Sequence, residues 1–199
     1  MTDPTPGLHP AQNRALRELY AAARQLAAHW DGLAGRLGAG EGVDDLRAGA
    51  GAADELLVEL ADLTEGYGLY GFPAAAGVGA RVAGLRNTLA DRTLERNQAL
   101  RMAVLDIQHV ATLCGYLAAL GEARGDEPMV EFCGRWERKL KRLEGRVRKA
   151  AIAAGADPDA AIEAVDHGPL GRAGHRLANA GGTLGEWVDR RSARRRGAG

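Results

Sequence analysis

The feature that most constrains this chain is an unbroken 3-4-3-4 spacing of apolar residues near its start. The series is Leu16, Leu19, Ala23, Leu26, Trp30, Leu33 and Leu37. A heptad repeat of this kind lies on one face of a helix, and that face must be buried against other helices. Pro10 suits a first helical turn and Gly38-Ala39-Gly40 ends the pattern, so the sequence predicts a helix over residues 10–37.

Three further apolar series predict three more amphipathic helices. The second helix begins near Val43-Asp44-Asp45, where acidic residues favour a helix N-terminus. Its expected inward residues are Ala53, Leu57, Leu60, Thr64 and Tyr67, with Leu56 and Leu63 widening the face. After it, the Gly- and Pro-rich residues 66–79 read as a connector, whose Tyr67, Tyr70 and Phe72 we expect to cover one end of the core.

The third and fourth helices are predicted over residues 91–124 and from Gly125-Asp126 to Gly155. The third has the inward series Leu100, Val104, Ile107, Ala111, Cys114, Leu117 and Gly121. The fourth has the inward series Met129, Phe132 or Cys133, Trp136, Leu140, Leu143, Val147 and Ala150. Its outer face alternates cations with Glu131, Glu137 and Glu144, which is typical of a solvated, ion-paired surface.

Composition agrees with an all-α protein. The chain has 39 Ala and 25 Leu but only 3 Ile, 10 Val and 7 Thr, and the latter three favour strands. The chain has 26 Lys and Arg residues and 26 Asp and Glu residues. This balance of charge argues against a protein whose whole surface binds nucleic acid or another polyanion. The chain has two cysteines, and they do not form a CxxC pair. It has no apolar run of about 18 residues and no signal peptide, so we expect a cytoplasmic protein.

Four amphipathic helices of this length predict a four-helix bundle over residues 10–155. Residues 1–9 are expected to be a disordered N-terminus, and residues 156–199 a C-terminal helical extension with an Arg-rich tail. The extension is predicted to open with a short helix over residues 157–166, because Asp157-Pro158 is a helix-start signal.

Two strings of the predicted bundle resemble a known family. The first is Leu16-Arg17-Glu18-Leu19-Tyr20-Ala21-Ala22-Ala23-Arg24-Gln25-Leu26. The second is Gln108-His109, followed by Gly115-Tyr116, Leu120-Gly121-Glu122 and Gly125-Asp126. Both are similar to the YciE/YciF family of ferritin-like stress proteins, over about residues 16–154. The resemblance implies a ferritin-like four-helix bundle, iron or manganese binding and a role in stress protection.

The departures from that family concern its metal ligands. By this resemblance Ala23 stands where the first helix carries Glu, and Gln108 and Ala111 stand where the third does. A di-iron site needs carboxylates from all four helices, so the sequence predicts that the metal centre is lost and that no cofactor is bound. The alternative is a residual Fe or Mn site formed by Asp106, His109 and a further carboxylate, Glu137 or else Glu55 or Glu59. The plainer interpretation of Asp106 and His109 is a surface pair one helical turn apart.

Three hypotheses on function follow. The leading one is a non-enzymatic bundle, expected to form a homodimer, that acts through protein–protein contacts or self-association. Its interaction residues are expected in the C-terminal extension: Gly181, Leu184, Trp187, Val188, Arg190, Arg191, Arg194, Arg195 and Arg196. The second is the residual metal-binding stress protein, and the third is an adaptor whose Arg tail binds nucleic acid or an anionic membrane. No catalytic set and no small-molecule substrate are evident, and Cys114 and Cys133 are expected to be buried thiols.

Overall fold

The computed structural model of the chain describes residues 7–69, 94–166 and 168. They form four long helices, α1 (Pro10–Leu37), α2 (Val43–Gly66), α4 (Arg96–Glu122) and α5 (Glu127–Ala153). A 3-10 turn, η2 (Ala154–Ala156), and a single-turn helix, α6 (Pro158–Ala161), follow α5. Within these residues there is no β-strand, only an isolated bridge, so the all-α prediction is confirmed.

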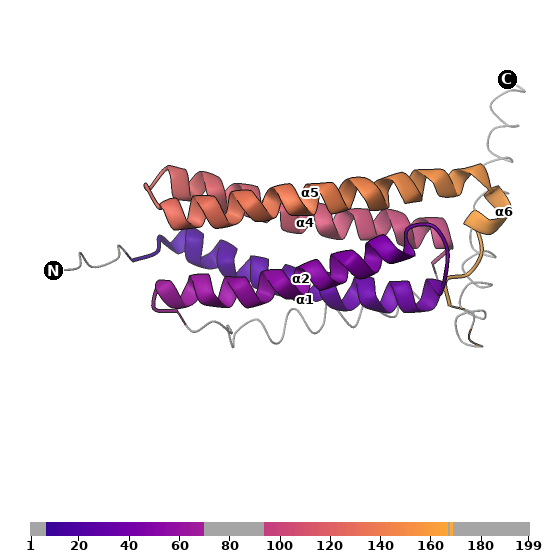
Figure 1. Cartoon of the computed structure of the whole chain (residues 1–199), viewed down its shortest axis with the longest axis horizontal. Helices are drawn as coiled ribbons and strands as arrows, with labels where there is room; N and C mark the ends of the chain where they lie inside the picture. Colours follow the sequence, from indigo (N-terminus) through magenta and orange to yellow (C-terminus); the bar gives the residue numbers. More distant parts are fainter. Residues whose placement is uncertain (1–6, 70–93, 167, 169–199) are drawn as a thin grey trace, which may run out of the picture.

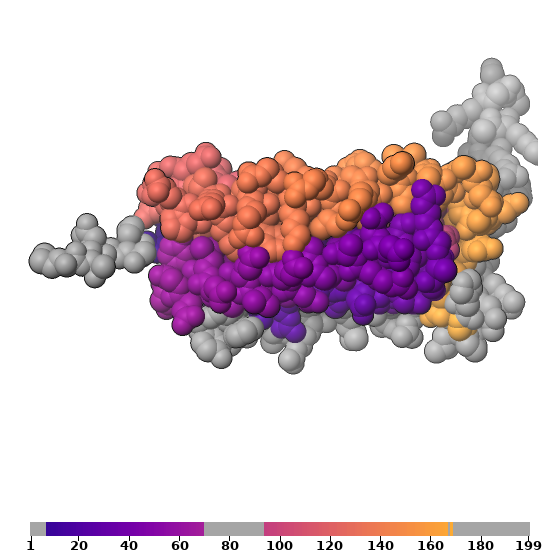
Figure 2. Space-filling view, in the orientation of Figure 1, coloured from indigo at the N-terminus to yellow at the C-terminus, as the bar shows by residue number. Residues whose placement is uncertain are grey.

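The four long helices pack lengthwise as two antiparallel hairpins, α1 with α2 and α4 with α5 (Figure 1). α1 also packs against α4, and α2 against α5, so each helix lies beside two antiparallel neighbours. α2 and α4 run in the same direction, which places Leu69 and Leu94 at opposite ends of the bundle. The chain between these two residues therefore connects one end of the molecule to the other. Figure 2 shows the resulting elongated body.

The heptad series of α1 forms one side of the core, as predicted. All seven of its residues are buried, and Trp30 is completely so. The predicted inward series of α4 and α5 are buried as well, including Trp136. On α2 the prediction is wrong in detail, because Leu56 and not Leu57 is the fully buried leucine of that turn.

Trp30 fits into the core because α2 carries a glycine opposite it. A Cβ atom built on Gly49 would lie 2.0 Å from Cζ3 of the Trp30 ring, so no larger residue fits there without displacement. The large residue of one helix thus packs onto the smallest residue of its neighbour, which brings α1 and α2 close together.

Two predicted helix boundaries are wrong, and one contact explains both. The chain is extended at Glu95 and α4 begins at Arg96, so it is not the continuous helix that was predicted from Asp91, a residue outside the described ones. Instead of continuing to Asp166, α6 ends at Ala161. The Arg96 amide donates to the Glu163 carbonyl at 2.8 Å. The Val165 amide donates to the Leu94 carbonyl at 3.2 Å, so these two segments satisfy each other's backbone groups and leave the helical conformation.

The segment after α5 is therefore attached to the bundle. Val165 is 1% exposed and belongs to the hydrophobic core, and Ala161 is also buried. Asp157 caps α6 by accepting a hydrogen bond from the Ala160 amide, as the Asp157-Pro158 signal predicts. These residues cover the end of the bundle where α4 begins (Figure 1).

α4 is long and apolar enough to span a membrane by length and composition, with an 18-residue window of mean hydropathy 1.4. Core helices of bundles meet the same criterion, and the series from Leu100 to Leu117 on α4 is buried against the other helices.

Candidate functional site

The residues of the alternative metal site lie apart in the structure. Asp106 Oδ2 is 2.5 Å from Nδ1 of His29 on α1, and both side chains are largely buried. His109 Nε2 is 3.4 Å from Oε1 of Glu18, also on α1, at an exposed position. The predicted surface pair between Asp106 and His109 is wrong, because α1 packs along this side of α4 and supplies each with a nearer counterpart.

The further carboxylates proposed for that site are engaged elsewhere. Glu137 lies 2.5 Å from Lys141 on the same helix. Glu55 pairs with Lys139 across the α2–α5 interface. Glu59 accepts hydrogen bonds from Arg135 at 2.6 Å and from the Trp136 indole at 3.0 Å.

The hydrogen bond from Arg135 lowers the pKa of Glu59, so this carboxylate is charged at neutral pH.

Within the described residues, the positions that match ligand positions of the resembled family carry no side chain suited to bind a metal ion. Ala23 and Ala111, which stand at ligand positions of the resembled family, are buried among apolar side chains. Gln108 donates to Glu144 of α5 at 3.2 Å. Among the described residues no three His, Cys, Asp or Glu side chains converge on a point where a metal ion would lie. These residues therefore do not fit a di-metal centre, which needs several shared carboxylate oxygens.

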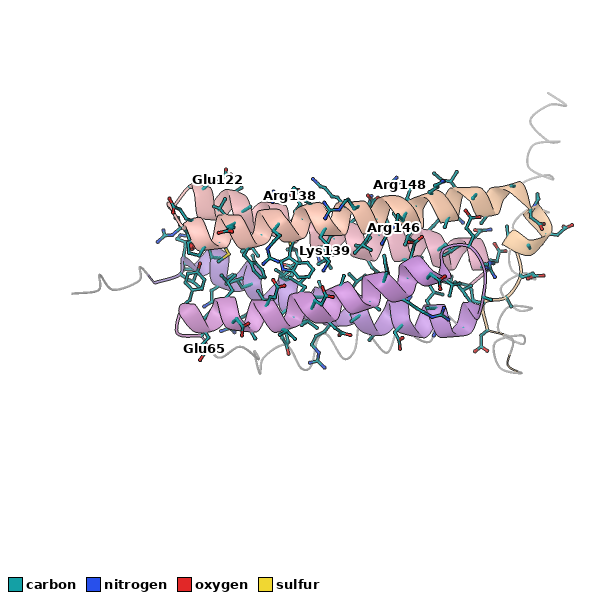
Figure 3. All side chains as sticks on the ribbon, in the orientation of Figure 1. Glu65, Glu122, Arg138, Lys139, Arg146 and Arg148 are labelled. Atoms are coloured by element: carbon teal, nitrogen blue, oxygen red, sulfur yellow. The ribbon has the colours of Figure 1, made fainter. Side chains whose placement is uncertain are left out.

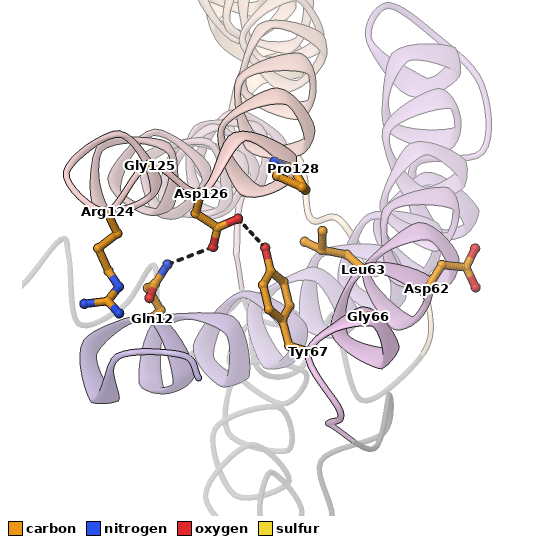
Figure 4. A pocket seen from close by; sticks show the side chains of 9 residues that line it. All are labelled: Gln12, Asp62, Leu63, Gly66, Tyr67, Arg124, Gly125, Asp126 and Pro128. Carbon is orange, nitrogen blue, oxygen red and sulfur yellow. Dashed lines mark hydrogen bonds between the residues drawn. The ribbon is translucent and has the colours of Figure 1, made fainter. Parts of the chain in front are cut away.

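A cavity of about 370 Å³ opens at the end of the bundle where α1 begins (Figure 4). It lies between the first turn of α1, the last turn of α2 and the turn joining α4 to α5. We call it the end cavity, and its lining residues are Gln12, Asp62, Leu63, Gly66, Tyr67, Arg124, Gly125, Asp126 and Pro128. Its volume is in the range of pockets that bind small ligands.

A polar network centred on Asp126 forms the wall of the end cavity. Asp126 Oδ1 accepts hydrogen bonds from the Tyr67 hydroxyl at 2.6 Å and from the Met129 amide at 3.2 Å. Its Oδ2 accepts one from Nε2 of Gln12 at 3.2 Å. One carboxylate thus caps α5 and joins it to α1 and α2 (Figure 4).

The local sequence explains how this carboxylate reaches its position. Gly125 has φ +68°, which a residue with a side chain rarely adopts, and it reverses the chain directly after α4. Asp126 then becomes the N-cap of α5, with Pro128 in the first turn. Gly125-Asp126 is recognisable in the sequence as a helix boundary. The contacts of Asp126 to Gln12 and Tyr67 are not, because these residues lie 114 and 59 positions away along the chain.

Tyr67 acts in this network as a hydrogen-bond donor. Burial and, after it, the hydrogen bond to Asp126 raise the pKa of the Tyr67 phenol well above its ordinary range. The phenol stays protonated at physiological pH, so it suits a structural or binding role and not that of a general base. The prediction that Tyr67 covers one end of the core is confirmed, whereas Tyr70 and Phe72 lie outside the described residues.

The two cysteines are buried free thiols, as predicted. Burial raises the pKa of Cys133 to about 12, and it raises that of Cys114 further. A nucleophilic cysteine needs the opposite shift, so neither thiol has the properties of a reactive group.

The outer face of α4 carries large apolar side chains at heptad spacing. Met102 is 45% exposed, Leu105 55% and Tyr116 50%, with His109 and Thr112 between them. We call these five residues the α4 stripe. From Met102 to Gly121 the helix has a single Asp, Glu, Lys or Arg residue, Asp106, whose carboxylate faces His29. An exposed helix face of a soluble bundle ordinarily carries charged residues, and this one does not.

α5 presents the opposite kind of surface, and its predicted ion-paired face is confirmed. Lys141 and Arg148 pair with Glu137 and Glu144 one turn earlier on the same helix. Arg135, Lys139 and Arg146 pair instead with Glu59, Glu55 and Asp45 of α2. Figure 3 shows Lys139 and Arg146 on the side of α5 that faces α2.

The interaction residues predicted in the C-terminal extension, Gly181 to Arg196, lie outside the described residues, so their role stays a prediction. Comparisons with protein families, with curated proteins and with solved structures find no match to this chain.

Proposed function

We propose that this chain is a ferritin-like bundle that has lost its metal centre and acts, without catalysis, by associating with a second copy of itself through the α4 stripe. The observation that carries the proposal is the row of exposed apolar side chains at Met102, Leu105 and Tyr116. Leaving such a row in water is unfavourable, and burying it against a second copy is the simplest way to remove it.

The connectivity supports the ferritin-like part of the proposal. Ferritin-like bundles consist of two helical hairpins joined by one long crossover. Here α2 and α4 run in the same direction, so the connection between them has to cover the length of the bundle, which is about 40 Å for a helix of 27 residues. A bundle of four sequential up-and-down helices would need only a short loop at that point.

The interior supports the loss of the metal centre. Alanines occupy the ligand positions at Ala23 and Ala111, and the rings of Trp30 and Trp136 are completely buried in the core. Placing two metal ions among these side chains would leave cations in an apolar interior with too few anions.

The α4 stripe is self-complementary in a way that favours a symmetric dimer. Two antiparallel copies of α4 crossing at His109 would bring together residues equally far from position 109. Met102 of each copy would then face Tyr116 of the other copy. The dimer would therefore contain two methionine–aromatic contacts, and such contacts are favourable. A two-fold axis of this kind is the commonest symmetry of soluble oligomers.

Sedimentation equilibrium of the full-length chain tests the proposal. The wild type is expected to be a dimer at concentrations of about 10 to 50 μM, which corresponds to a Kd in the micromolar range. Leu105→Lys should weaken dimerisation at least tenfold, because it buries a charge in an apolar contact. The matched control is Val58→Lys on α2, whose side chain is 66% exposed but lies outside the stripe. A monomeric wild type, or equal weakening by both variants, would contradict the proposal.

The C-terminal extension is the competing interface. If the extension carries the assembly, truncation at Gly168, or Gly181→Pro or Gly181→Arg, is expected to abolish assembly while the bundle stays folded. If truncation produces monomers and Leu105→Lys does not, the extension is the interface and the α4 stripe is not. The Arg tail as a nucleic-acid or membrane adaptor makes a third prediction, that binding falls steeply with salt and disappears when residues 190–199 are removed.

A further inference from the structure

We infer that the end cavity is a binding site for a small organic cation, an ammonium group carried on a short apolar body. The cavity is separate from the α4 stripe, since only the turn after α4 contributes to it. The inference therefore does not depend on the proposed self-association.

The charge of the cavity wall selects a cation. Asp126 is half-buried, and its three hydrogen-bond donors, Tyr67, Gln12 and the Met129 amide, are all neutral. Among the described residues none forms an ion pair with this carboxylate. The positive end of the α5 dipole partly compensates its charge, but a ligand cation would do so directly.

One atom of that carboxylate has room for a further donor. From the described residues, Oδ1 already accepts two hydrogen bonds, whereas Oδ2 accepts one. Each carboxylate oxygen has two lone-pair directions, so Oδ2 retains one for the N–H of an ammonium group. The ring of Tyr67 also lines the cavity beside Asp126, and an aromatic face attracts a cation (Figure 4).

The remaining walls suit an apolar body. Leu63 and Pro128 line the cavity with hydrocarbon, and Gly66 and Gly125 leave room because they have no side chain. An alkyl or phenyl group of a few carbon atoms would displace water from these walls.

An anionic ligand is disfavoured for two reasons. The cavity is lined by two carboxylates, Asp62 and Asp126, against a single guanidinium, that of Arg124. The N-terminus of α5, which would otherwise attract an anion, is already occupied by the Asp126 carboxylate. Arg124 lies on the Gln12 side of the cavity and repels a bound cation, which makes it the residue that limits affinity (Figure 4).

The test compares three probes of similar size on the full-length protein by calorimetry and amide NMR. They are 2-phenylethylammonium, neutral 2-phenylethanol and anionic 3-phenylpropionate. The cation is expected to bind at least tenfold more tightly than the neutral analogue and to shift the Met129 amide resonance. Equal binding of the neutral analogue, tighter binding of the anion, or no binding of the cation at millimolar concentration would overturn the inference.

Two substitutions complete the test. Asp126→Asn removes the charge while keeping a side chain that accepts hydrogen bonds, and it should weaken cation binding at least tenfold. Asp126→Asn also alters the cap of α5, so weaker binding by this variant could reflect a folding defect. Arg124→Ala is therefore the second variant of the test. It should strengthen cation binding several-fold, a gain that a folding defect cannot produce. Unchanged affinity in both variants would contradict the site.

Discussion

At the scale of single residues, the contact of Trp30 with Gly49 determines how closely α1 and α2 approach. A Cβ atom at Gly49 would lie 2.0 and 2.2 Å from two carbon atoms of the Trp30 ring. The ring is fully buried, and side chains in a close-packed core have little room to move. A glycine inside a helix normally lowers the stability of that helix. At position 49 this loss is offset by the packing of the Trp30 ring against the glycine.

We expect Gly49→Ala to destabilise the protein by about 1–3 kcal/mol, the usual cost of overpacking a core. The matched control is Gly51→Ala, two residues further along α2, where a Cβ atom would meet nothing within 4 Å. That variant should gain about 0.5–1 kcal/mol from the better helix propensity of alanine. Urea unfolding followed by circular dichroism measures both. Equal effects of the two substitutions would show that Trp30 does not limit this position.

Glu59 is a second residue whose environment predicts a measurable effect. Its pKa is lowered, chiefly by the hydrogen bond from Arg135, so it binds protons less readily in the folded state than in the unfolded one. A group of this kind stabilises the fold above its unfolded pKa and loses that contribution as the pH falls through its folded pKa.

Glu59→Gln should therefore be less stable than the wild type at pH 7, and the difference should shrink as the pH falls below about 4. Midpoints of urea unfolding across this pH range give the comparison. Glu65→Gln is the control, because Glu65 is exposed and forms no ion pair in the described structure. A Glu59→Gln difference that is constant with pH would mean that the charge of Glu59 contributes nothing.

At the scale of elements, α2 and α5 are held together by opposite charge as well as by apolar packing. α2 has seven acidic residues and one Arg, whereas α5 has eight basic residues and four Glu. Three ion pairs cross between them. Exposed pairs contribute little stability individually, but they disfavour packings that would place α5 beside the other, less acidic helices.

The segment after α5 is the element whose role differs most from expectation. Residues 163–165 pair with residues 94–96 and place Val165 in the core, so this stretch closes the end of the bundle. It also shows why α4 begins at Arg96. The Arg96 amide, which has no partner within its own helix, donates to the Glu163 carbonyl.

If residues 163–165 are part of the bundle, Val165→Ala should cost about 2 kcal/mol, from the lost burial of two carbon groups and the space they leave. Ile162→Ala is the matched control, since Ile162 is 51% exposed three residues earlier, and its effect should stay within about 0.5 kcal/mol. Chemical unfolding of the full-length chain distinguishes them. Equally small effects would assign these residues to a loosely attached extension.

At the scale of the whole molecule, the question is whether a bundle with this connectivity binds metal. The carboxylates that the sequence analysis considered lie on different sides of the bundle, and each is close to a Lys, Arg or His side chain. An ion placed near one of them would not find three His, Cys, Asp or Glu ligands within the described residues. A metal site needs several ligands at one point, and the tertiary structure distributes these over three interfaces.

We therefore expect the protein purified from cells grown with added iron and manganese to contain close to no metal per chain by elemental analysis. His109→Ala should leave that value unchanged. About two metal ions per chain, lost in His109→Ala, would overturn the proposed loss of the centre and return the search to Asp106 and His109.

The helices and their buried faces follow from the amino-acid sequence alone. A 3-4-3-4 apolar repeat has one physical solution, a helix buried along that stripe, and the predicted start at Pro10 and the inward series of α1, α4 and α5 agree with the structure. The buried cysteines and the ion-paired face of α5 follow from the same periodicity.

Which residues meet across helices depends instead on how the helices pack against one another. Asp106 faces His29, Tyr67 and Gln12 converge on Asp126, and Val165 enters the core beside Leu94. Periodicity states which face of a helix is buried, but it does not state which helix lies opposite or at what register. Those contacts depend on how two hairpins dock over many residues of chain, and the end cavity and the α4 stripe are both products of that docking.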